Sequence, residues 1–245
     1  GMSGMQIAET AQVGTASTGM IGRARQQIVQ MTDYFSARSL AGNEEAMVFL
    51  DANECAHGPF IGAHDLARYS AQQPRELQRA FCHWLDVSSR NLTITRGADE
   101  AIDCLVRSFC EPGMDNIVTC PPTFAMYAQS AMLQNVEVRQ APLTSVFGLD
   151  PAAIAAAMDE ATKLVFVCSP NNPTGNVMNA TAITDLCIAC NGRALVVVDE
   201  TYIEYAIDAG DAASLVPALE RFANLVVLRT LSKSHAAAGL RCGCA

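Results

Sequence analysis

The chain has 245 residues, of which 50% are hydrophobic and 17% are charged, and its formal net charge is −9. This length allows one large domain, or one domain and part of a second. The net charge is acidic, and the sequence shows no cluster of basic residues of the kind that nucleic-acid-binding proteins have. No apolar run reaches the roughly 20 residues that a membrane span needs. No secretory pattern begins the chain, so we expect a cytoplasmic protein that binds neither nucleic acid nor membrane.

The ten cysteines are scattered, and most of them lie within apolar stretches. We therefore expect reduced thiols in a protein core. Cys187 and Cys190 form a C-x-x-C pair, but no second pair has zinc-finger spacing. The helical pattern around the pair places both thiols on one inner face, which favours packing over a metal or redox role. We expect no metal site.

The N-terminal part of the chain differs in composition from the rest. Residues 1–19 are rich in small and polar residues, which indicates a mobile arm. An amphipathic helix is predicted over 20–38, and 20–48 is expected to form an arm or the first part of a small domain. We expect 49–245 to form one large domain.

From about residue 90, short β-branched runs alternate with helical patterns. The predicted strands are 92–95, 116–120, 136–142, 164–169, 194–200 and 225–230, and the predicted helices are 98–110, 124–133, 151–159, 180–191 and 212–221. This alternation predicts an α/β fold with a mostly parallel sheet that is sandwiched by helices. Such sheets bind ligands beyond the carboxyl ends of their strands.

Polar, turn-forming and titratable residues follow these strands, together with one aromatic residue. They are Gly97, Ala98 and Asp99 after the first strand, Phe124 after the second, Asn172 after 164–169, Asp199 and Tyr202 after 194–198, and Thr230, Ser232 and Lys233 after the last. A sheet with a purely structural role would need only turn residues at this edge. The pattern therefore predicts a ligand site there.

Lysine is rare in this chain, since only Lys163 and Lys233 occur among the 16 basic residues. Lys233 is a potential amine nucleophile, and a partly buried Asp199 would require a cationic partner. The helix start at Gly97 offers free N–H groups to a phosphate, and Arg241 could bind the same phosphate. Together with an aromatic ring at Phe124, these groups match the requirements of pyridoxal 5'-phosphate.

Each of these features also has a plainer interpretation when it is taken alone. Residues 172–175 (NPTG) are a turn signal, and Asp199 with Glu200 would suit a helix cap. Arg241 could form a surface ion pair, and Tyr202 could simply pack. The hypothesis of a cofactor site depends on their joint appearance, each after its own strand.

Several motifs resemble the fold-type I pyridoxal phosphate enzymes, and specifically the histidinol-phosphate aminotransferase-like branch. The motifs span 50–243 and include LDANE (50–54), RY with QP (68–74), GADEAID (97–103), FCEPG (109–113), PPTFAMY (121–127), SPNNPTG (169–175), DETYIEY (199–205) and RTLSKSHAAAGLRCG (229–243). The resemblance implies an aspartate aminotransferase-like fold. It also implies transfer of an amino group between an amino donor and a 2-oxo acid by a ping-pong route.

The resemblance also implies roles for particular residues. Lys233 would hold the cofactor as a Schiff base and later shuttle a proton. Asp199 would pair with the pyridine nitrogen, and Asn172 and Tyr202 would hydrogen-bond the phenolate oxygen.

The remaining cofactor contacts follow from the same resemblance. The phosphate would be held by Ala98, Asp99, Ser232 and Arg241, with Thr230 nearby. Phe124 would stack on the ring where the branch usually has tyrosine, and Tyr69 would reach the cofactor of the partner subunit in a homodimer.

The chain departs from the branch around His57, near the expected substrate position, and at His235 after the lysine. Each histidine could touch a ligand or simply pack. The family continues for roughly a hundred more residues, so we expect the C-terminal part of the small domain, with its substrate-binding arginines, to be absent from this chain. A decarboxylase of the same fold and a non-catalytic cofactor-sensing domain remain alternatives to the aminotransferase.

Overall fold

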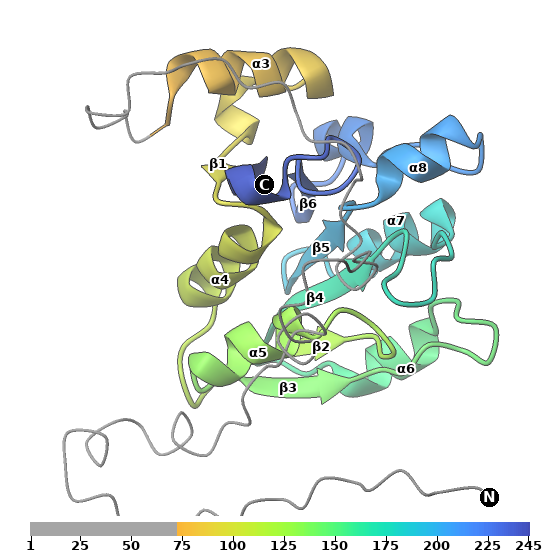
Figure 1. Ribbon diagram of the computed structural model, residues 1–245. Coiled ribbons are helices and arrows are strands. Elements are labelled where there is room, and N and C mark those ends of the chain that lie inside the picture. Colours follow the sequence, from red (N-terminus) through yellow and green to blue (C-terminus); the bar gives the residue numbers. More distant parts are fainter. Residues whose placement is uncertain (1–72) are drawn as a thin grey trace, which may run out of the picture. The chain divides into compact units, whose positions relative to one another are not determined.

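Residues 73–245 are described by a computed structural model, which is shown in Figure 1. The predictions for 1–19, for the helix over 20–38, and for His57 and Tyr69 lie outside the described residues. No described helix is long and apolar enough to cross a membrane.

A seven-stranded sheet forms the centre of the described part. Its spatial order is β1-β7-β6-β5-β4-β2-β3, with neighbouring strands from β3 to β6 parallel and β7 antiparallel to both β6 and β1. The strands are β1 (Ile94–Thr95), β2 (Asn116–Thr119), β3 (Glu137–Gln140), β4 (Thr162–Cys168), β5 (Leu195–Asp199), β6 (Leu225–Thr230) and β7 (Gly243–Cys244). The prediction of a mostly parallel sheet is confirmed.

Helices cover both faces of this sheet (Figure 1). They are α3 (Arg75–Leu85), α4 (Ala98–Phe109), α5 (Met126–Leu133), α6 (Pro151–Ala157), α7 (Ala180–Ala189) and α8 (Ile203–Asp208), with 3₁₀ helices η2 (Ser89–Asn91), η3 (Val216–Glu220) and η4 (Ala238–Leu240). Four of the five predicted helices are confirmed within a few residues. Helix α3 was not predicted.

Alternation along the strands determines which face each side chain meets. On β5, Val197 packs against the face covered by α4 and α5, whereas Val196 and Val198 pack against the face covered by α6 and α7. Strand β4 alternates in the same way, and all these side chains are buried. Because both faces are covered, the strands read as continuous apolar runs in the sequence.

The connections reverse direction between β2 and β4. From β2 the chain moves outward to β3, and it then crosses back over β2 through α6 to reach β4, from which it proceeds to β5 and β6. In open α/β sheets such a reversal opens a crevice at the carboxyl ends of the two strands. The loops that follow β2, from Cys120, and β4, from Ser169, both begin at this crevice.

The helix predicted over 212–221 is wrong. The structure has a short helix α8 earlier, at Ile203–Asp208, and only the 3₁₀ helix η3 at Val216–Glu220. The buried carboxylate of Glu200 accepts hydrogen bonds from Ser214 Oγ and Leu215 N, both at 2.6 Å. These bonds hold the preceding residues in a loop, so a helix cannot start there.

The two ends of the predicted sheet also differ from expectation. Strand β1 has two residues instead of four, and 225–230 is not the last strand because β7 follows it. A Cβ on Gly243 would lie 2.7 Å from the carbonyl oxygen of Arg229 and 3.0 Å from Cα of Gly97. Strand β7 is therefore set by close backbone contact, which leaves no hydrophobic pattern in the sequence.

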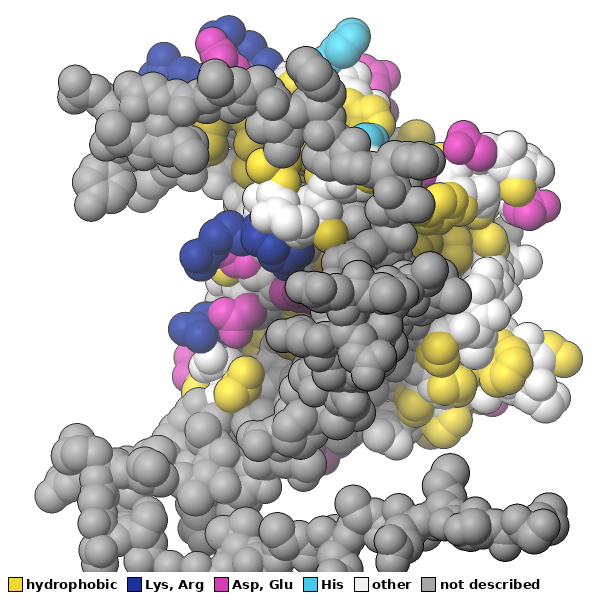
Figure 2. Space-filling model, viewed as in Figure 1, with side chains coloured by type: hydrophobic (Ala, Val, Ile, Leu, Met, Phe, Trp, Pro, Cys, Tyr) yellow, Lys and Arg dark blue, Asp and Glu magenta, His cyan; other side chains and the backbone are white. Residues whose placement is uncertain are grey.

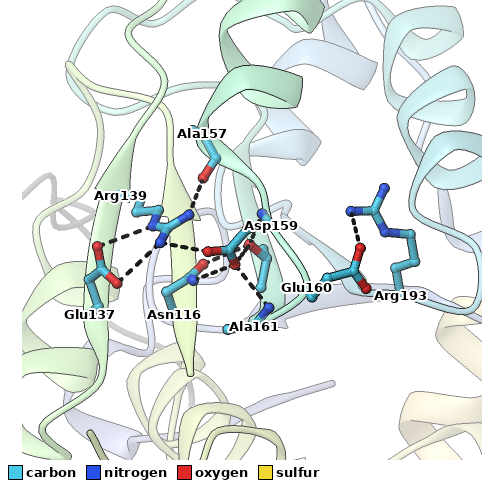
Figure 3. Close-up of polar contacts among 9 residues, drawn as sticks. Asn116, Glu137, Arg139, Ala157, Asp159, Glu160, Ala161 and Arg193 are labelled. Atoms are coloured by element: carbon cyan, nitrogen blue, oxygen red, sulfur yellow. Dashed lines mark hydrogen bonds and ion pairs between the residues drawn. The ribbon is translucent and has the colours of Figure 1, made fainter. Parts of the chain in front are cut away.

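A polar network joins the turn after α6 to the amino ends of β2 and β4 (Figure 3). Asp159 Oδ1 accepts hydrogen bonds from Asn116 Nδ2 and Ala161 N, both at 2.9 Å, and Asp159 Oδ2 lies 2.7 Å from Arg139 Nη2. The hydrogen bond from Asn116 is the main cause that lowers the pKa of Asp159. This network lies at the edge of the sheet opposite to the predicted ligand site, so we assign it a structural role.

The nine cysteines within the described range are free thiols, and seven of them are buried. Cys187 and Cys190 are both fully buried, as the helical pattern predicted, and burial raises the pKa of Cys187 to about 11. A thiol with so high a pKa is a weak nucleophile and metal ligand. Within residues 73–245, no group of His, Cys, Asp and Glu side chains could hold a metal ion.

Candidate active site

Asp199 ends β5 and is only 2% exposed. Alternation from Val197 turns its side chain toward the face that carries α4 and α5. Its Oδ1 accepts hydrogen bonds from Thr201 N at 3.0 Å and Thr201 Oγ1 at 2.6 Å, and its Oδ2 accepts one from the Tyr127 hydroxyl at 2.7 Å. Within residues 73–245, all of its hydrogen-bond donors are therefore neutral groups.

Burial raises the pKa of Asp199, while hydrogen bonds from Thr201 and Tyr127 lower it, and the charge of Asp99 raises it further. Among residues 73–245, Asp199 therefore meets none of the cationic partners that a buried carboxylate normally has. The prediction that Asp199 would be buried is confirmed. The geometry suits a cationic ligand atom at this position.

Tyr127 was not identified as a site residue from the sequence. It lies on α5, is fully buried, and its ring stacks on Phe166 with centroids 4.8 Å apart. Phe124 meets the same ring edge-on at 5.7 Å. Burial is the main cause that raises the pKa of Tyr127 well above its usual value, so the hydroxyl keeps its proton and donates it to Asp199 in a hydrogen bond. The signal in the sequence was its spacing of three from Phe124, which would place both rings on one side of the helix predicted over 124–133.

A second group of predicted residues meets at the start of α4. Arg241 Nη2 lies 3.3 Å from Asp99 Oδ2, and Arg241 Nη1 lies 3.4 Å from Ser232 Oγ. The Thr230 hydroxyl donates to the same Ser232 oxygen at 2.9 Å. Five predicted phosphate contacts from three distant segments are thus brought together: Gly97, Asp99, Thr230, Ser232 and Arg241.

Gly97 shows why glycine is needed here. Its φ of 81° lies in the left-handed region, and a Cβ at this position would lie 2.8 Å from Arg241 Nη2. Any side chain would therefore displace the guanidinium. The N–H groups at the start of α4 and the guanidinium of Arg241 together form a cradle for an anion. Figure 2 shows basic side chains beside acidic ones along the side where α4 lies, so the positive charge of the cradle is local.

The third group contains Lys233, Tyr202 and Asn172. Lys233 Nζ lies 5.8 Å from the centre of the Tyr202 ring. Tyr202 and Asn172 line a cavity of about 570 Å³, whose wall also includes residues 170–173 and Tyr205. The neighbouring Asn171 was not predicted to matter. It fixes the loop by accepting a hydrogen bond from Thr123 Oγ1 at 2.9 Å and by donating one to the Pro122 carbonyl at 2.9 Å.

The two other predicted positions have simpler surroundings. His235 packs edge-on against Trp84 at 4.9 Å, and its Nδ1 lies 3.0 Å from Ser234 Oγ. The structure therefore favours packing for this histidine. Phe124 is half-buried beside Tyr127.

The arrangement defines an α/β domain with a candidate ligand site at the carboxyl edge of its sheet. The site combines a buried carboxylate, an amine and an anion cradle. The family model described as aminotransferase class I and II matches residues 50–245, and the chain belongs to this family.

Curated relatives support the same family assignment. The chain is 44% identical over 225 residues to the histidinol-phosphate aminotransferase of Photobacterium profundum, and the match covers 90% of this chain and 58% of that protein. It is 46% identical to the enzyme of the same name from Vibrio campbellii, with coverage of 90% and 62%. The chain thus spans about three fifths of the length of these relatives.

Solved structures agree with the fold. The histidinol-phosphate aminotransferase from Sinorhizobium meliloti, solved in complex with pyridoxal-5'-phosphate, has a TM-score of 0.70 and 26% identity, with coverage of 79% of this chain and 54% of that chain. An aspartate aminotransferase double mutant from Thermus thermophilus has a TM-score of 0.63 at 23% identity, covering 72% and 48%. The predicted aspartate aminotransferase-like fold is confirmed.

Proposed function

We propose that the protein is a pyridoxal phosphate-dependent aminotransferase, which moves an amino group between a histidinol phosphate-like donor and a 2-oxo acid by a ping-pong route. The family and the names of the relatives support this proposal. The observation that carries it is the buried Asp199, whose described donors are all neutral. A protonated pyridine nitrogen would be a cationic partner of a kind that residues 73–245 do not supply to this carboxylate.

The described residues fit the cofactor. Asp199 would hold the pyridine nitrogen, and Phe124 would lie against the ring. Asn172 and Tyr202 would donate hydrogen bonds to the phenolate oxygen, and Lys233 would supply the amine that attaches the cofactor. Its phosphate would be bound by the cradle at the start of α4, that is by Gly97, Ala98, Asp99, Thr230, Ser232 and Arg241. When bound, pyridoxal phosphate supplies an electron sink for the bond that breaks at the α-carbon of the substrate.

The protein groups then have separate tasks. Burial raises the pKa of Asp199, and the hydrogen bonds from Thr201 and Tyr127 favour its charged form. An ionised Asp199 would keep the ring nitrogen of the bound cofactor protonated. Lys233 Nζ carries the proton that leaves the α-carbon of the amino donor. The burial of Asp199 on the face that carries α4 and α5 keeps its carboxylate away from water.

The test of this proposal is to locate the cofactor by chemistry. The full-length protein should show visible absorption from bound pyridoxal phosphate, and borohydride reduction followed by peptide mapping should place the label on Lys233. Lys163 is an internal control, since it lies 3.8 Å from Asp115 near the amino end of β4, away from the site. A label on Lys163, or no label, would contradict the proposal.

Product analysis tests the reaction itself. Incubation with histidinol phosphate and 2-oxoglutarate should form the corresponding oxo product and glutamate in equal amounts. A second incubation uses phosphothreonine, which carries a carboxyl group that histidinol phosphate lacks. Release of carbon dioxide from phosphothreonine, with no glutamate formed from 2-oxoglutarate in either incubation, would contradict the aminotransferase and indicate a decarboxylase of the same fold.

We also propose the assembly, the location and the domains on the basis of the resemblance. The protein would be a cytoplasmic homodimer in which Tyr69 reaches the partner's cofactor, with 49–245 as its large domain. Mixing a Tyr69→Phe variant with a Lys233→Ala variant tests this arrangement. Each hybrid dimer should contain one site with both wild-type residues and one site that lacks both, so mixing should raise the activity per lysine-bearing site. Activity that is unchanged by mixing, or monomers in analytical ultracentrifugation, would contradict it.

A further inference from the structure

A buried cluster of charged side chains lies behind the candidate site. Arg229 on β6 has a side chain that is only 5% exposed, and its two terminal nitrogens contact different carboxylates. Nη1 lies 3.5 Å from Glu200 Oε2, and Nη2 contacts Glu204 Oε1. The side chain of Glu200 is 1% exposed and that of Glu204 is 18% exposed. None of these three residues belongs to the set assigned to cofactor binding.

The cluster lies on the face of the sheet opposite to Asp199. Side chains alternate along a strand, so Glu200 points away from the face that Asp199 meets, and Arg229 points away from the face that Leu228 meets. Leu228 packs with α4 and α5, whereas Val227 packs with α6 and α7. The cluster therefore cannot touch a ligand held by Asp199, and its effect must pass through the backbone.

Joining β6 to the β5–α8 turn through buried charges is energetically unfavourable. It contains two carboxylates and one guanidinium, and within residues 73–245 the buried atoms Glu204 Oε2 and Arg229 Nε have no hydrogen-bond partner. Burial raises the pKa of Glu200 despite its bonds to Leu215 N and Ser214 Oγ and the charge of Arg229. Buried ion pairs of this kind are often no more stabilising than apolar residues of similar size. Stability alone is thus a poor explanation for it.

The residues of this cluster lie close in sequence to Tyr202 and Lys233. Glu200 and Glu204 stand two residues before and two residues after Tyr202, so both flanks of that residue are tied to Arg229. Arg229 stands four residues before Lys233.

An aromatic contact reaches the other side of Lys233. The Arg229 guanidinium lies over the Trp84 ring at 4.6 Å, and Trp84 in turn packs on His235, two residues after Lys233. The β5–α8 turn, strand β6 and helix α3 are thereby joined at one point.

We propose that Arg229 is a positioning residue that sets the place of Lys233 relative to Tyr202 and Asp199 from the back of the sheet. This inference rests on the proposed function. A forked guanidinium can hold two carboxylates in fixed directions, which a single ammonium cannot do. The separation of 5.8 Å between Lys233 Nζ and the Tyr202 ring is the quantity that the cluster fixes.

The experiment replaces the whole cluster, so that no buried charge is left without a partner. The triple variant Glu200→Gln, Glu204→Gln and Arg229→Met should fold with a melting temperature at or above that of the wild type. We expect the pH midpoint of the visible absorption of the bound cofactor to move. We also expect kcat to fall about 10- to 100-fold with little change in KM, which is the scale of a small misplacement of reacting groups. A matched control removes the partly exposed ion pair on α4 with Asp103→Asn and Arg107→Met, and it should leave both quantities unchanged.

A folded triple variant with the wild-type midpoint and the wild-type kcat would overturn the proposal. If the triple variant does not fold, Arg229→Lys decides the question, because it keeps the charge and loses the fork. Its midpoint and kcat should shift in the same direction by a smaller factor, and wild-type values for both would overturn the proposal. Failure of the proposed function looks different, since the wild-type protein itself would then show no cofactor absorption.

Discussion

The hydroxyl of Tyr127 offers the sharpest test of the buried carboxylate. Tyr127→Phe removes a 2.7 Å hydrogen bond to Asp199 Oδ2 and leaves the ring stacked on Phe166. Hydrogen bonds to charged groups contribute about 1.5–3 kcal/mol, and Oδ2 has no other described donor. For a protein of this size, each kcal/mol shifts the melting temperature by about 2–4 °C. From these two ranges, we expect the variant without cofactor to lose about 3–12 °C at about pH 8.

The measurement is thermal or urea unfolding of the cofactor-free protein, followed by circular dichroism. Ile188→Val serves as the control, because that residue is 63% exposed and surface changes usually stay within about 0.5 kcal/mol. The hydrogen bonds from Thr201 remain in the variant, and loss of the bond from Tyr127 should raise the pKa of Asp199 further than burial already does. A loss no larger than the roughly 0.5 kcal/mol of a surface change would refute the reasoning, since it would mean that the carboxyl is protonated or the bond is absent.

Three further predictions concern the same molecule. Because burial raises the pKa of Asp199 above its ordinary 3.8, the folded state binds that proton more tightly than the unfolded state, and stability falls as pH rises between the two values. Asp199→Asn without cofactor should therefore gain stability relative to the wild type across that window, and a constant difference in urea unfolding would contradict this. Asp159 behaves in the opposite way: its pKa is lowered, so its contribution should be lost as pH falls below its ordinary value, and Asn116→Ala should flatten that loss in acid unfolding curves. Gly97→Ala should cost about 1–2 kcal/mol for the left-handed backbone and, by displacing Arg241, should weaken pyridoxal phosphate binding in a fluorescence titration; unchanged binding would exclude the cradle.

The sequence predicted the centre of this fold well because the parallel strands are buried on both faces. Runs such as 195–198 must then be apolar and mostly β-branched, which leaves a strong local signal. The position of Asp199 followed directly, since it is the first polar residue after such a run. The helix at 98–109 was found with similar accuracy because Gly97 and two acidic residues mark its start.

The parts that failed depend on contacts between distant residues. The region 212–221 has a helical composition, yet a carboxylate at Glu200 holds its first residues in a loop. Strand β7 has two residues and forms because Gly243 permits close backbone packing. Tyr127 looked like one more aromatic residue of α5, because its partner Asp199 is 72 residues away. Such pairings leave no period or cap in the local sequence.

The contact between Gly243 and Gly97 has a consequence for any redesign of the cofactor pocket. The backbone of Gly243 in β7 packs directly against the backbone of Gly97 at the start of α4, with no side chain between them. Variation at either position is therefore epistatic with the other: a methyl group at 243 would push against the loop that carries the cradle. A library that varies the phosphate-cradle residues should keep Gly243 unchanged. A substitution at Gly243 would shift the loop at Gly97 and so change the measured affinity for the cofactor, although Gly243 is not one of the cradle residues.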